Sequence, residues 1–410
     1  MIKNKCMEEY IWQNNKWPHF TWEPQKLISP LLEVHTNQGI LEGQMRSLGF
    51  AVQSETTLRR FTQEIQKSFE IEGENVSDYS LRSSIARHLG IERIILASDG
   101  QLDKPRPRID AIVDVITDAV HNCHTPLSIA RLFQWHRKLF PQNANGMAFN
   151  GIYTIRTGQL RTDEEGPMRV ISGTGKNYTV HFQAPPAEIL QKEMEMFLKW
   201  FNYSDTETHI NSVIKSAIAH LYFVTLHPFE DGNGRLARAI ADMALCRGDN
   251  FDHNDVWVVG EATPSYGQEL RFDHLYSMSA QLCKERHDYY AQLEHAQKQS
   301  SMDITEWLLW YIGCMNRAIL NVLKEIAESQ ARKQFWEYAE TCDINDRQRK
   351  ILTMLLDDFQ GKLTSTKYAK ICKCSQDTAT RDIEKLITAR IIRKGEAGGR
   401  STSYELISKL

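Results

Sequence analysis

The chain has 410 residues, which is enough for two or three domains that each bury a core. Hydrophobic residues make up 41% and charged residues 25%, an ordinary globular composition that excludes wholesale disorder, collagen and coiled-coil rods. The formal net charge is -3, so no global field selects a polyanionic or polycationic partner. Residues 341–410 nevertheless hold 14 Lys and Arg against 9 Asp and Glu, a local excess of +5. This basic tail on an acidic body predicts a separate module that meets a polyanion.

The compartment is suggested by three features of the sequence. Eight cysteines are sparse and irregularly spaced, which favours a reducing environment. The N-terminal segment has no apolar signal core. The longest apolar run, Trp307 to Met315, is too short to span a bilayer. We therefore expect a cytoplasmic protein with no membrane partner.

Apolar periodicity predicts a mostly helical body behind an aromatic, proline-broken arm at residues 17–24. Helices are expected over 31–72, 78–89, two parts of 109–140 divided near 125–126, 187–201, 209–225, 236–247, 270–297 and 303–329. Within a polar, glycine-rich stretch, MRVIS and YTVHF flank a glycine-containing turn and predict one hairpin. The fold class is thus mainly α with a small β component.

The last seventy residues change character. Helices are predicted over 347–358, 364–372 and 375–389, followed by short strands near 391–393 and 403–406 around a glycine-rich turn. Three helices followed by a two-stranded ribbon is the element order of a winged helix.

The most informative stretch, residues 227–238, reads HPFEDGNGRLAR and lies between two predicted helices. Gly232 and Gly234 flank an asparagine, so the backbone can bend and bring N–H groups close to an anion. The helix that follows adds the positive end of its dipole. Arg235 and Arg238 are three residues apart and share a helix face, so both can meet phosphate oxygens.

Two further side chains of this stretch supply chemistry. Asp231 is a hard oxygen ligand placed for Mg²⁺ on a di- or triphosphate. His227 can act as a base near neutral pH. The sequence therefore predicts a site that binds nucleotide phosphates and deprotonates an incoming hydroxyl. A purely structural glycine loop around a buried histidine is the competing interpretation.

This string resembles the Fic family motif HPFx[D/E]GNGRxxR at every position, and the resemblance extends over about 126–293. Fic proteins typically transfer AMP from ATP to a protein hydroxyl. The resemblance implies a Fic helical bundle with a β-hairpin flap, ATP as substrate, Mg²⁺ as cofactor and a target protein that offers Ser, Thr or Tyr. An inactive descendant that keeps the pattern is also compatible with the sequence.

The resemblance also implies roles for single residues. His227 would be the general base, and Asp231 would hold Mg²⁺. Phosphate contacts would come from Gly232, Asn233, Gly234, Arg235, Leu236 and Arg238, with Arg235 at the leaving pyrophosphate and Arg238 at the γ-phosphate. Tyr289 and Gln297 resemble adenine-side contacts, although the family often has Asn where Gln297 stands. A helical aromatic residue such as Tyr289 is equally typical of a core.

The hairpin at 169–182 resembles the family's flap, which docks a target segment by strand addition. The flap residues are Val170, Ile171, Ser172 and Gly173. An ordinary surface hairpin is the alternative interpretation.

The first long helical stretch ends in SFEIEG, residues 68–73. This string resembles the inhibitory motif [S/T]xxxE[G/N] that precedes some Fic domains. The resemblance implies that Ser68 and Glu72 belong to an inhibitory helix. Glu72 would form an Arg–carboxylate pair with Arg238 and remove the partner of the γ-phosphate. An exposed carboxylate at a helix end is the alternative.

The C-terminal segment resembles a winged helix of transcription-regulator type, with residues 376–389 as the recognition helix. Arg381, Lys385 and Arg400 are the candidate DNA contacts. Protein contact or dimerisation is the alternative use of such a module. We divide the chain into a regulatory region at 1–105, a Fic catalytic domain at 106–300, a linker helix at 301–341 and a winged helix at 342–410.

The sequence thus predicts a protein adenylyltransferase that modifies a target protein under inhibition by Glu72, with the protein itself as one candidate target. We expect it to act as a homodimer. Two alternatives remain open at this point: a Fic enzyme with another nucleotide donor or de-AMPylating activity, and a DNA-binding regulator that uses the Fic domain as a nucleotide sensor.

Overall fold

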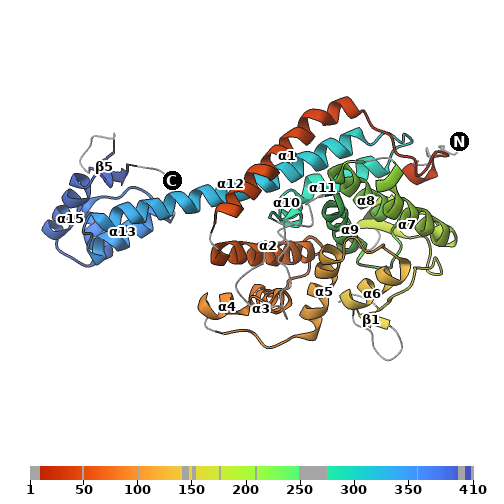
Figure 1. Cartoon of the computed structure of the whole chain (residues 1–410), viewed down its shortest axis with the longest axis horizontal. Helices are drawn as coiled ribbons and strands as arrows, with labels where there is room; N and C mark the ends of the chain where they lie inside the picture. Colours follow the sequence, from red (N-terminus) through yellow and green to blue (C-terminus); the bar gives the residue numbers. More distant parts are fainter. Residues whose placement is uncertain are drawn as a thin grey trace. The chain divides into compact units, whose positions relative to one another are not determined.

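The computed structural model describes most of the chain, and Figure 1 labels many of its helices and some of its strands. The described residues are 10–48, 50–98, 101–140, 147–149, 154–174, 177–207, 210–248, 275–357, 359–395 and 402–407. They fall into two compact units, Met1–Leu320 and Asn321–Leu410. The structure is mainly helical, as the sequence predicts.

The first unit begins with the short helix η1 and four longer helices. Their bounds are η1 (Ile11–Gln13), α1 (Pro24–Ser47), α2 (Phe50–Ile71), α3 (Asp78–Leu89) and α4 (Glu92–Ser98). The arm before α1 is ordered, and Trp17 packs edge-on against Tyr222 with ring centroids 5.1 Å apart. Pro24 starts α1, where its missing N–H costs nothing. An extended backbone at Leu48 ends α1, so the helical stretch predicted over 31–72 is two helices rather than one.

The remainder of the first unit supplies the site and its surroundings. Its elements are α5 (Pro107–His121), α6 (Ile129–Leu139), β1 (Met147–Phe149), β2 (Thr154–Arg156), β3 (Arg169–Thr174), β4 (Asn177–Gln183), η2 (Ala187–Ile189), α7 (Leu190–Glu207), α8 (Ser212–Leu226), α9 (Asn233–Gly248), α10 (Met278–Lys284) and α11 (Arg286–Gln297). The next helix, α12 (Thr305–Thr341), begins in the first unit and ends in the second. The helix predicted over 270–297 is broken at Glu285 into α10 and α11, and its first five residues lie outside the described part. The apolar periodicity of the sequence does not predict the strand pair β1–β2 or helix α4.

Helices α8 and α9 form the centre of this unit. Almost every side chain of α8 and α9 is buried, including polar ones, so these helices are covered on all sides. They pack against each other and against α2, α5, α6 and α7. The turn that joins α8 to α9 therefore has its ends held rigidly by the core.

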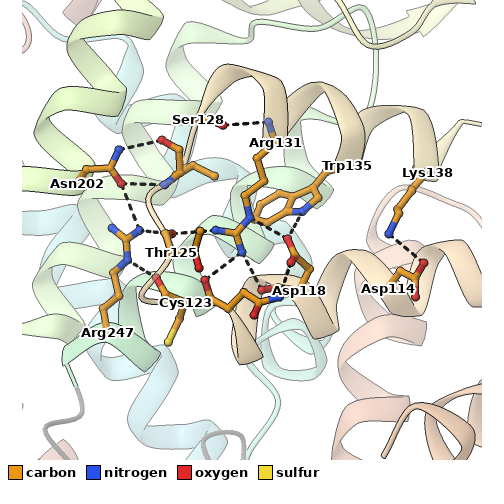
Figure 2. A network of polar contacts seen from close by, with 12 residues as sticks. Asp114, Asp118, Cys123, Thr125, Ser128, Arg131, Trp135, Lys138, Asn202 and Arg247 are labelled. Atoms are coloured by element: carbon orange, nitrogen blue, oxygen red, sulfur yellow. Dashed lines mark hydrogen bonds and ion pairs between the residues drawn. The ribbon is translucent and has the colours of Figure 1, made fainter.

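A polar network fastens the far end of α9 to its neighbours (Figure 2). Arg247 donates to the carbonyl oxygens of Cys123 and Phe201 and to the side-chain oxygen of Asn202. Beside it, Arg131 of α6 donates to Asp118 of α5 at 2.8 Å. Charge-assisted bonds of this kind are shorter and stronger than neutral ones. They fix the direction of α9 and hence of the residues at its N-terminus.

The second unit has the predicted order of three helices and a ribbon. Its elements after α12 are α13 (Asp346–Leu356), α14 (Ser365–Cys372), α15 (Gln376–Thr388), β5 (Ile392–Lys394) and β6 (Tyr404–Leu406). Asn345, Thr364 and Ser375 cap the three helices through their side chains. Buried Asp382 accepts hydrogen bonds from Arg347 and Tyr368 and joins α13, α14 and α15. No helix in the described ranges has both the length and the apolar character needed to cross a membrane.

Candidate active site

The turn between α8 and α9 has a fixed and unusual backbone. His227 ends α8 in the left-handed region at φ 48°, which is uncommon for a residue other than glycine. Gly232 lies at φ +80°, and a Cβ there would stand 2.7 Å from the Phe140 ring. Asn233 closes the turn: Phe229 donates its N–H to the side-chain oxygen at 3.0 Å, and the side-chain amide donates back to the Phe229 carbonyl at 2.8 Å. The first glycine and the asparagine of the motif are therefore required by the backbone itself.

His227 is half-buried and neutral at physiological pH. Burial lowers the pKa of His227 to about 4. Its Nδ1–H donates to the Val224 carbonyl at 3.3 Å, so Nε2 carries the lone pair of the neutral ring. Arg161 donates Nε–H to the His227 carbonyl at 2.7 Å and Nη2–H to the Pro185 carbonyl at 2.5 Å. These contacts orient a histidine whose Nε2 is able to accept a proton.

The N-terminus of α9 follows directly after Asp231. The Asp231 carboxylate is half-buried and accepts the Gly232 N–H at 2.5 Å, while Arg235 lies 3.5 Å from the same oxygen. Within the described residues no cluster of three or more His, Cys, Asp or Glu side chains is arranged to hold a metal ion. A single carboxylate at a helix N-terminus can hold Mg²⁺ only when phosphate oxygens supply further ligands to the ion.

Both motif arginines are buried, and both pair with acidic residues that follow α2. Arg235 contacts Glu74 at 2.6 Å and lies over the ring of Phe140, with its guanidinium carbon 4.6 Å from the ring centroid. Its Nε–H, like Nη1 of Arg238, is buried and has no hydrogen-bond partner among the residues that the structure describes. Buried donors without partners are uncommon. An anionic oxygen placed beside either N–H group could therefore accept a hydrogen bond from it.

Arg238 is held by α2 and the residue that follows it through three hydrogen bonds. Its Nε–H donates to the Ser68 hydroxyl and its Nη2–H to the Ser68 carbonyl, each at 2.8 Å. Nη2 also contacts the Glu72 carboxylate at 2.8 Å. The predicted partners Ser68, Glu72 and Arg238 thus come together, although the contact of Glu72 is monodentate. A Cβ built at Gly234 would collide with Glu72, so this carboxylate lies directly on the first turn of α9.

The remaining nucleotide candidates lie in the core. Leu236 is fully buried, and its N–H donates to the Gly232 carbonyl. The Tyr289 hydroxyl bonds Nε2 of His220 at 2.8 Å, and burial raises the pKa of Tyr289. Gln297 is buried and donates to the Thr225 hydroxyl at 3.2 Å. The structure therefore places each of these side chains against another part of the core.

The flap candidates lie on a two-stranded antiparallel hairpin. Val170 and Ile171 of β3 are 36% and 52% exposed, which is unusual for strand residues of this kind. In the described part of the chain β3 pairs with β4 alone. Its outer edge therefore presents unpaired backbone groups. Ser172 and Gly173 follow on the same strand and are also exposed.

The candidate DNA contacts divide into two groups. Arg381 and Lys385 are exposed on α15 and lie one turn apart. Arg400 lies outside the described residues.

Sequence reasoning missed three residues that shape the site. Arg161 orients His227 from a loop, and Glu74 neutralises Arg235 from beyond the end of α2. His136 of α6 is fully buried, donates Nε2–H to the Asp231 carbonyl at 3.1 Å and accepts the Gly158 N–H at 3.0 Å. Burial lowers the pKa of His136 to about 4. None of the three gave a signal in the sequence, because each reaches the turn from a distant segment.

This geometry defines a helical domain with a glycine-bent loop at a helix N-terminus, a neutral histidine beside the loop and two buried arginines behind it. Residues 126–245 match the Fic/DOC family, and residues 10–91 match a domain of unknown function, DUF4172. The chain therefore carries a Fic/DOC domain behind an N-terminal DUF4172 domain. Glu72 and Ser68 lie within the DUF4172 match, whereas Arg238 lies within the Fic match.

Two curated relatives match part of the chain. A uridine 5'-monophosphate transferase from Xanthomonas campestris pv. campestris is 32% identical over 126 residues, which are 30% of this chain and 21% of that protein. A protein adenylyltransferase, fic-1, from Caenorhabditis elegans is 27% identical over 124 residues, 30% of this chain and 20% of that protein. The matches span about a fifth of the length of these relatives. A solved Fic family protein from Desulfovibrio desulfuricans is 18% identical, with a TM-score of 0.47 over 95% of this chain and 98% of that chain.

Proposed function

We propose that the chain is a nucleotidyltransferase that moves AMP from ATP to a Ser, Thr or Tyr hydroxyl of a target protein, and that Glu72 inhibits it. The observation that carries the proposal is the position of the Glu72 carboxylate, on the first turn of α9 and 2.8 Å from Arg238. A helix N-terminus backed by buried arginines is an anion site, and here it holds an anion of the chain itself. We assign regulation to residues 1–105, catalysis to 106–300, linkage to 301–341 and a winged helix to 342–410.

In the proposed reaction, His227 Nε2 accepts the proton of the target hydroxyl. The neutral ring is available for this because the pKa of His227 is about 4. The Gly232 and Gly234 amides and the α9 dipole stabilise charge on the α- and β-phosphates, and Arg235 balances the leaving pyrophosphate. Asp231 is the residue that would hold Mg²⁺. When bound, the ion would neutralise phosphate charge.

Inhibition follows from competition for one guanidinium group. Arg238 has its Nε and Nη2 donors engaged by Ser68 and Glu72. A γ-phosphate would have to displace the Glu72 carboxylate, because two anions cannot share this buried site without a large repulsion. With Arg238 engaged, the triphosphate would sit with its α-phosphate poorly aligned for in-line attack.

The nucleotide donor is the part of the proposal that a binding experiment has to decide. The Tyr289 and Gln297 side chains expected at the adenine are both engaged in the core, and one of the curated relatives is named a UMP transferase. A thermal-shift panel with ATP, UTP, GTP and CTP, each with Mg²⁺, separates the donors. We expect ATP to give the largest stabilisation. A larger shift with UTP would reassign the donor, and removal of AMP from a pre-modified target would indicate the reverse activity.

The decisive experiment compares two variants with triphosphates labelled at the α-phosphate and a cell extract as acceptor. Glu72→Gly is expected to label extract proteins, whereas Glu72→Gly combined with His227→Ala is expected to label none. Equal labelling by both would refute the assignment of His227 as base. Binding of nucleotide without any covalent label would instead favour the nucleotide-sensor function.

We propose in addition that the second unit binds duplex DNA. Arg381 and Lys385 stand exposed on one face of α15, the third helix of a winged-helix order, where such modules contact phosphates and bases. Asp377 and Glu384 on the same helix oppose strong binding, so we expect affinity that falls steeply with salt. Lack of any mobility shift at low salt for the intact protein would refute this function, and loss of a shift in Arg381→Ala with Lys385→Ala would support it.

A further inference from the structure

The N-terminal arm, the described residues 10–23 before α1, contacts the β3–β4 hairpin. The Trp12 indole N–H donates to the Gln183 carbonyl at 2.8 Å. The ring of Tyr10 packs edge-on against the ring of Phe182, with centroids 5.3 Å apart. Both rings are buried, at 7% and 1% exposed, in a hydrophobic cluster separate from the main core. The arm therefore fastens the hairpin through a hydrogen bond and through apolar packing.

Trp12 lies at the edge of β4 that faces away from β3. The Ala184 N–H donates to the carbonyl of Met168, directly before β3, at 3.0 Å. The N–H and C=O of one planar trans peptide group point in opposite directions, so the Gln183 carbonyl of that group points away from β3. This is the carbonyl that the Trp12 indole engages. A strand added to β4 would need the same acceptor, so Trp12 closes this edge of the hairpin.

Helix α11 and the residue after it fasten β4 at two further points. Lys298 donates to the Val180 carbonyl at 3.2 Å and to the Glu294 carboxylate at 2.9 Å. The same carboxylate lies 2.7 Å from Nδ1 of His181. Strand β4 is therefore held over its last four residues by α11 and by the arm together.

The arm is itself fixed, so it can brace the hairpin. Thr21 donates its N–H to the Met302 carbonyl and accepts the Ile304 N–H, each at 2.8 Å. Closer to the start of the arm, the Asn14 side chain donates to the Ser300 carbonyl. All three partners lie in the short segment between α11 and α12. The arm and α11 are therefore joined into one support for β4.

Strand β3, by contrast, has an open edge. In the described part of the chain it pairs with β4 alone, and its Ile171 side chain is 52% exposed. Tyr178 of β4, 49% exposed, lies on the same face, because it pairs with Gly173, two residues after Ile171. An extended segment with apolar side chains can therefore pair with β3 and cover this face, whereas the outer edge of β4 is already engaged.

We infer that the N-terminal arm belongs to the acceptor site, with Tyr10 and Trp12 as positioning residues that hold the hairpin so that β3 receives an extended segment of the target protein. This inference rests on the proposed function, because docking of a target matters only if the chain transfers a nucleotidyl group to protein. The DUF4172 match contains both the arm and α2. That domain thus contacts the Fic match at two places, at Arg238 and at the hairpin.

The test removes the indole N–H of Trp12 and keeps an aromatic ring, by Trp12→Phe in the full chain carrying Glu72→Gly. Trp17→Phe is the matched control, since Trp17 also lies in the arm but donates its indole N–H to Glu193 of α7 at 2.8 Å. Hydrogen–deuterium exchange with mass spectrometry should show exchange of the β3 and β4 amides about fivefold faster in Trp12→Phe, as for loss of one hydrogen bond, and unchanged in Trp17→Phe. Calorimetric binding of ATP with Mg²⁺ should be unchanged in both.

The second measurement is transfer of α-phosphate label to cell-extract proteins at increasing extract concentration. Trp12→Phe should raise the half-saturating extract concentration about fivefold and leave the maximal rate near that of the Glu72→Gly chain, whereas a merely structural role would lower the maximal rate and ATP binding together.

Three outcomes would overturn the inference and leave the proposed function intact: unchanged hairpin exchange in Trp12→Phe, an unchanged half-saturating concentration, or equal effects of Trp12→Phe and Trp17→Phe. Absence of label from the Glu72→Gly chain itself would instead refute the proposed function. Faster hairpin exchange confined to Trp12→Phe would then still uphold the arm as the brace of the hairpin.

Discussion

Removing the Glu72 carboxylate should raise nucleotidyl transfer. Of the three hydrogen bonds that the charged Arg238 guanidinium donates, the two to Ser68 have neutral acceptors and only the one to Glu72 joins two opposite charges. A hydrogen bond to a charged group contributes about 1.5–3 kcal/mol, against about 1 kcal/mol for a neutral one. Because about 1.4 kcal/mol is a factor of ten, Glu72→Gly should raise transfer by about 10- to 100-fold. Glu72→Gln keeps a hydrogen-bond acceptor without the charge and should give a smaller increase.

The assay is initial-rate transfer of α-phosphate label at saturating nucleotide, with Glu70→Gly as the matched control. Glu70 lies two residues earlier on α2 and pairs with Lys67 at 2.5 Å rather than with the site. Both changes place glycine near the same helix end, so they share the loss of helix propensity. Glu70→Gly should leave the rate near that of the unmodified chain. If both variants rise equally, loosening of α2 and not the Glu72 charge is responsible, and the reasoning is refuted.

Three further predictions concern the turn and its histidine. Asn233→Ala leaves both backbone groups of Phe229 buried without partners and should lower stability by about 2–4 kcal/mol, measured by chemical unfolding. Gly232→Ala should abolish nucleotide binding measured by calorimetry, because φ is +80° and Phe140 occupies the space, whereas Gly166→Ala, at φ +108° in open surroundings, should retain it. The transfer rate of the Glu72→Gly chain should fall only as pH drops toward about 4, where His227 gains a proton, and a fall centred near 6.5 would contradict the buried base.

Two buried neutral histidines also predict how the free energy of unfolding changes as the pH falls. Burial lowers the pKa of His220 to about 3 and that of His136 to about 4, whereas both would titrate near 6.5 in the unfolded chain. Below pH 6.5 the unfolded state therefore binds more protons than the folded state, so stability is fully present above 6.5 and is lost as pH falls toward 4. Equilibrium unfolding between pH 8 and 4.5 measures this loss, and His136→Gln should weaken it. An unfolding free energy independent of pH in this window would contradict the prediction.

The sequence predicted the local parts of this site well because they are contiguous. Residues 227–238 hold the histidine, the bent glycines and both arginines within twelve positions, and helix periodicity places them between α8 and α9. Ser68 and Glu72 also reach Arg238, and the order of elements in the second unit is as predicted. These features depend on local spacing, which a single sequence carries.

The other contacts of the site join segments that are far apart in the sequence, so no local residue spacing predicts them. Glu74 meets Arg235 across 161 positions, and His136 meets Asp231 across 95 positions. The aromatic periodicity around Tyr289 fits a core helix and a ligand contact equally, and in the structure its hydroxyl bonds His220.

The most direct test of the account is a thermodynamic cycle of ATP and ADP binding to the unmodified and Glu72→Gly chains, measured by calorimetry with Mg²⁺. The central claim is that Glu72 and the γ-phosphate compete for Arg238, which is 3% exposed and 2.8 Å from the Glu72 carboxylate. We predict that Glu72→Gly tightens ATP binding by about tenfold and changes ADP binding by less than about twofold. Equal changes for both nucleotides, or none for either, would show that Glu72 does not compete with the γ-phosphate and would contradict the account.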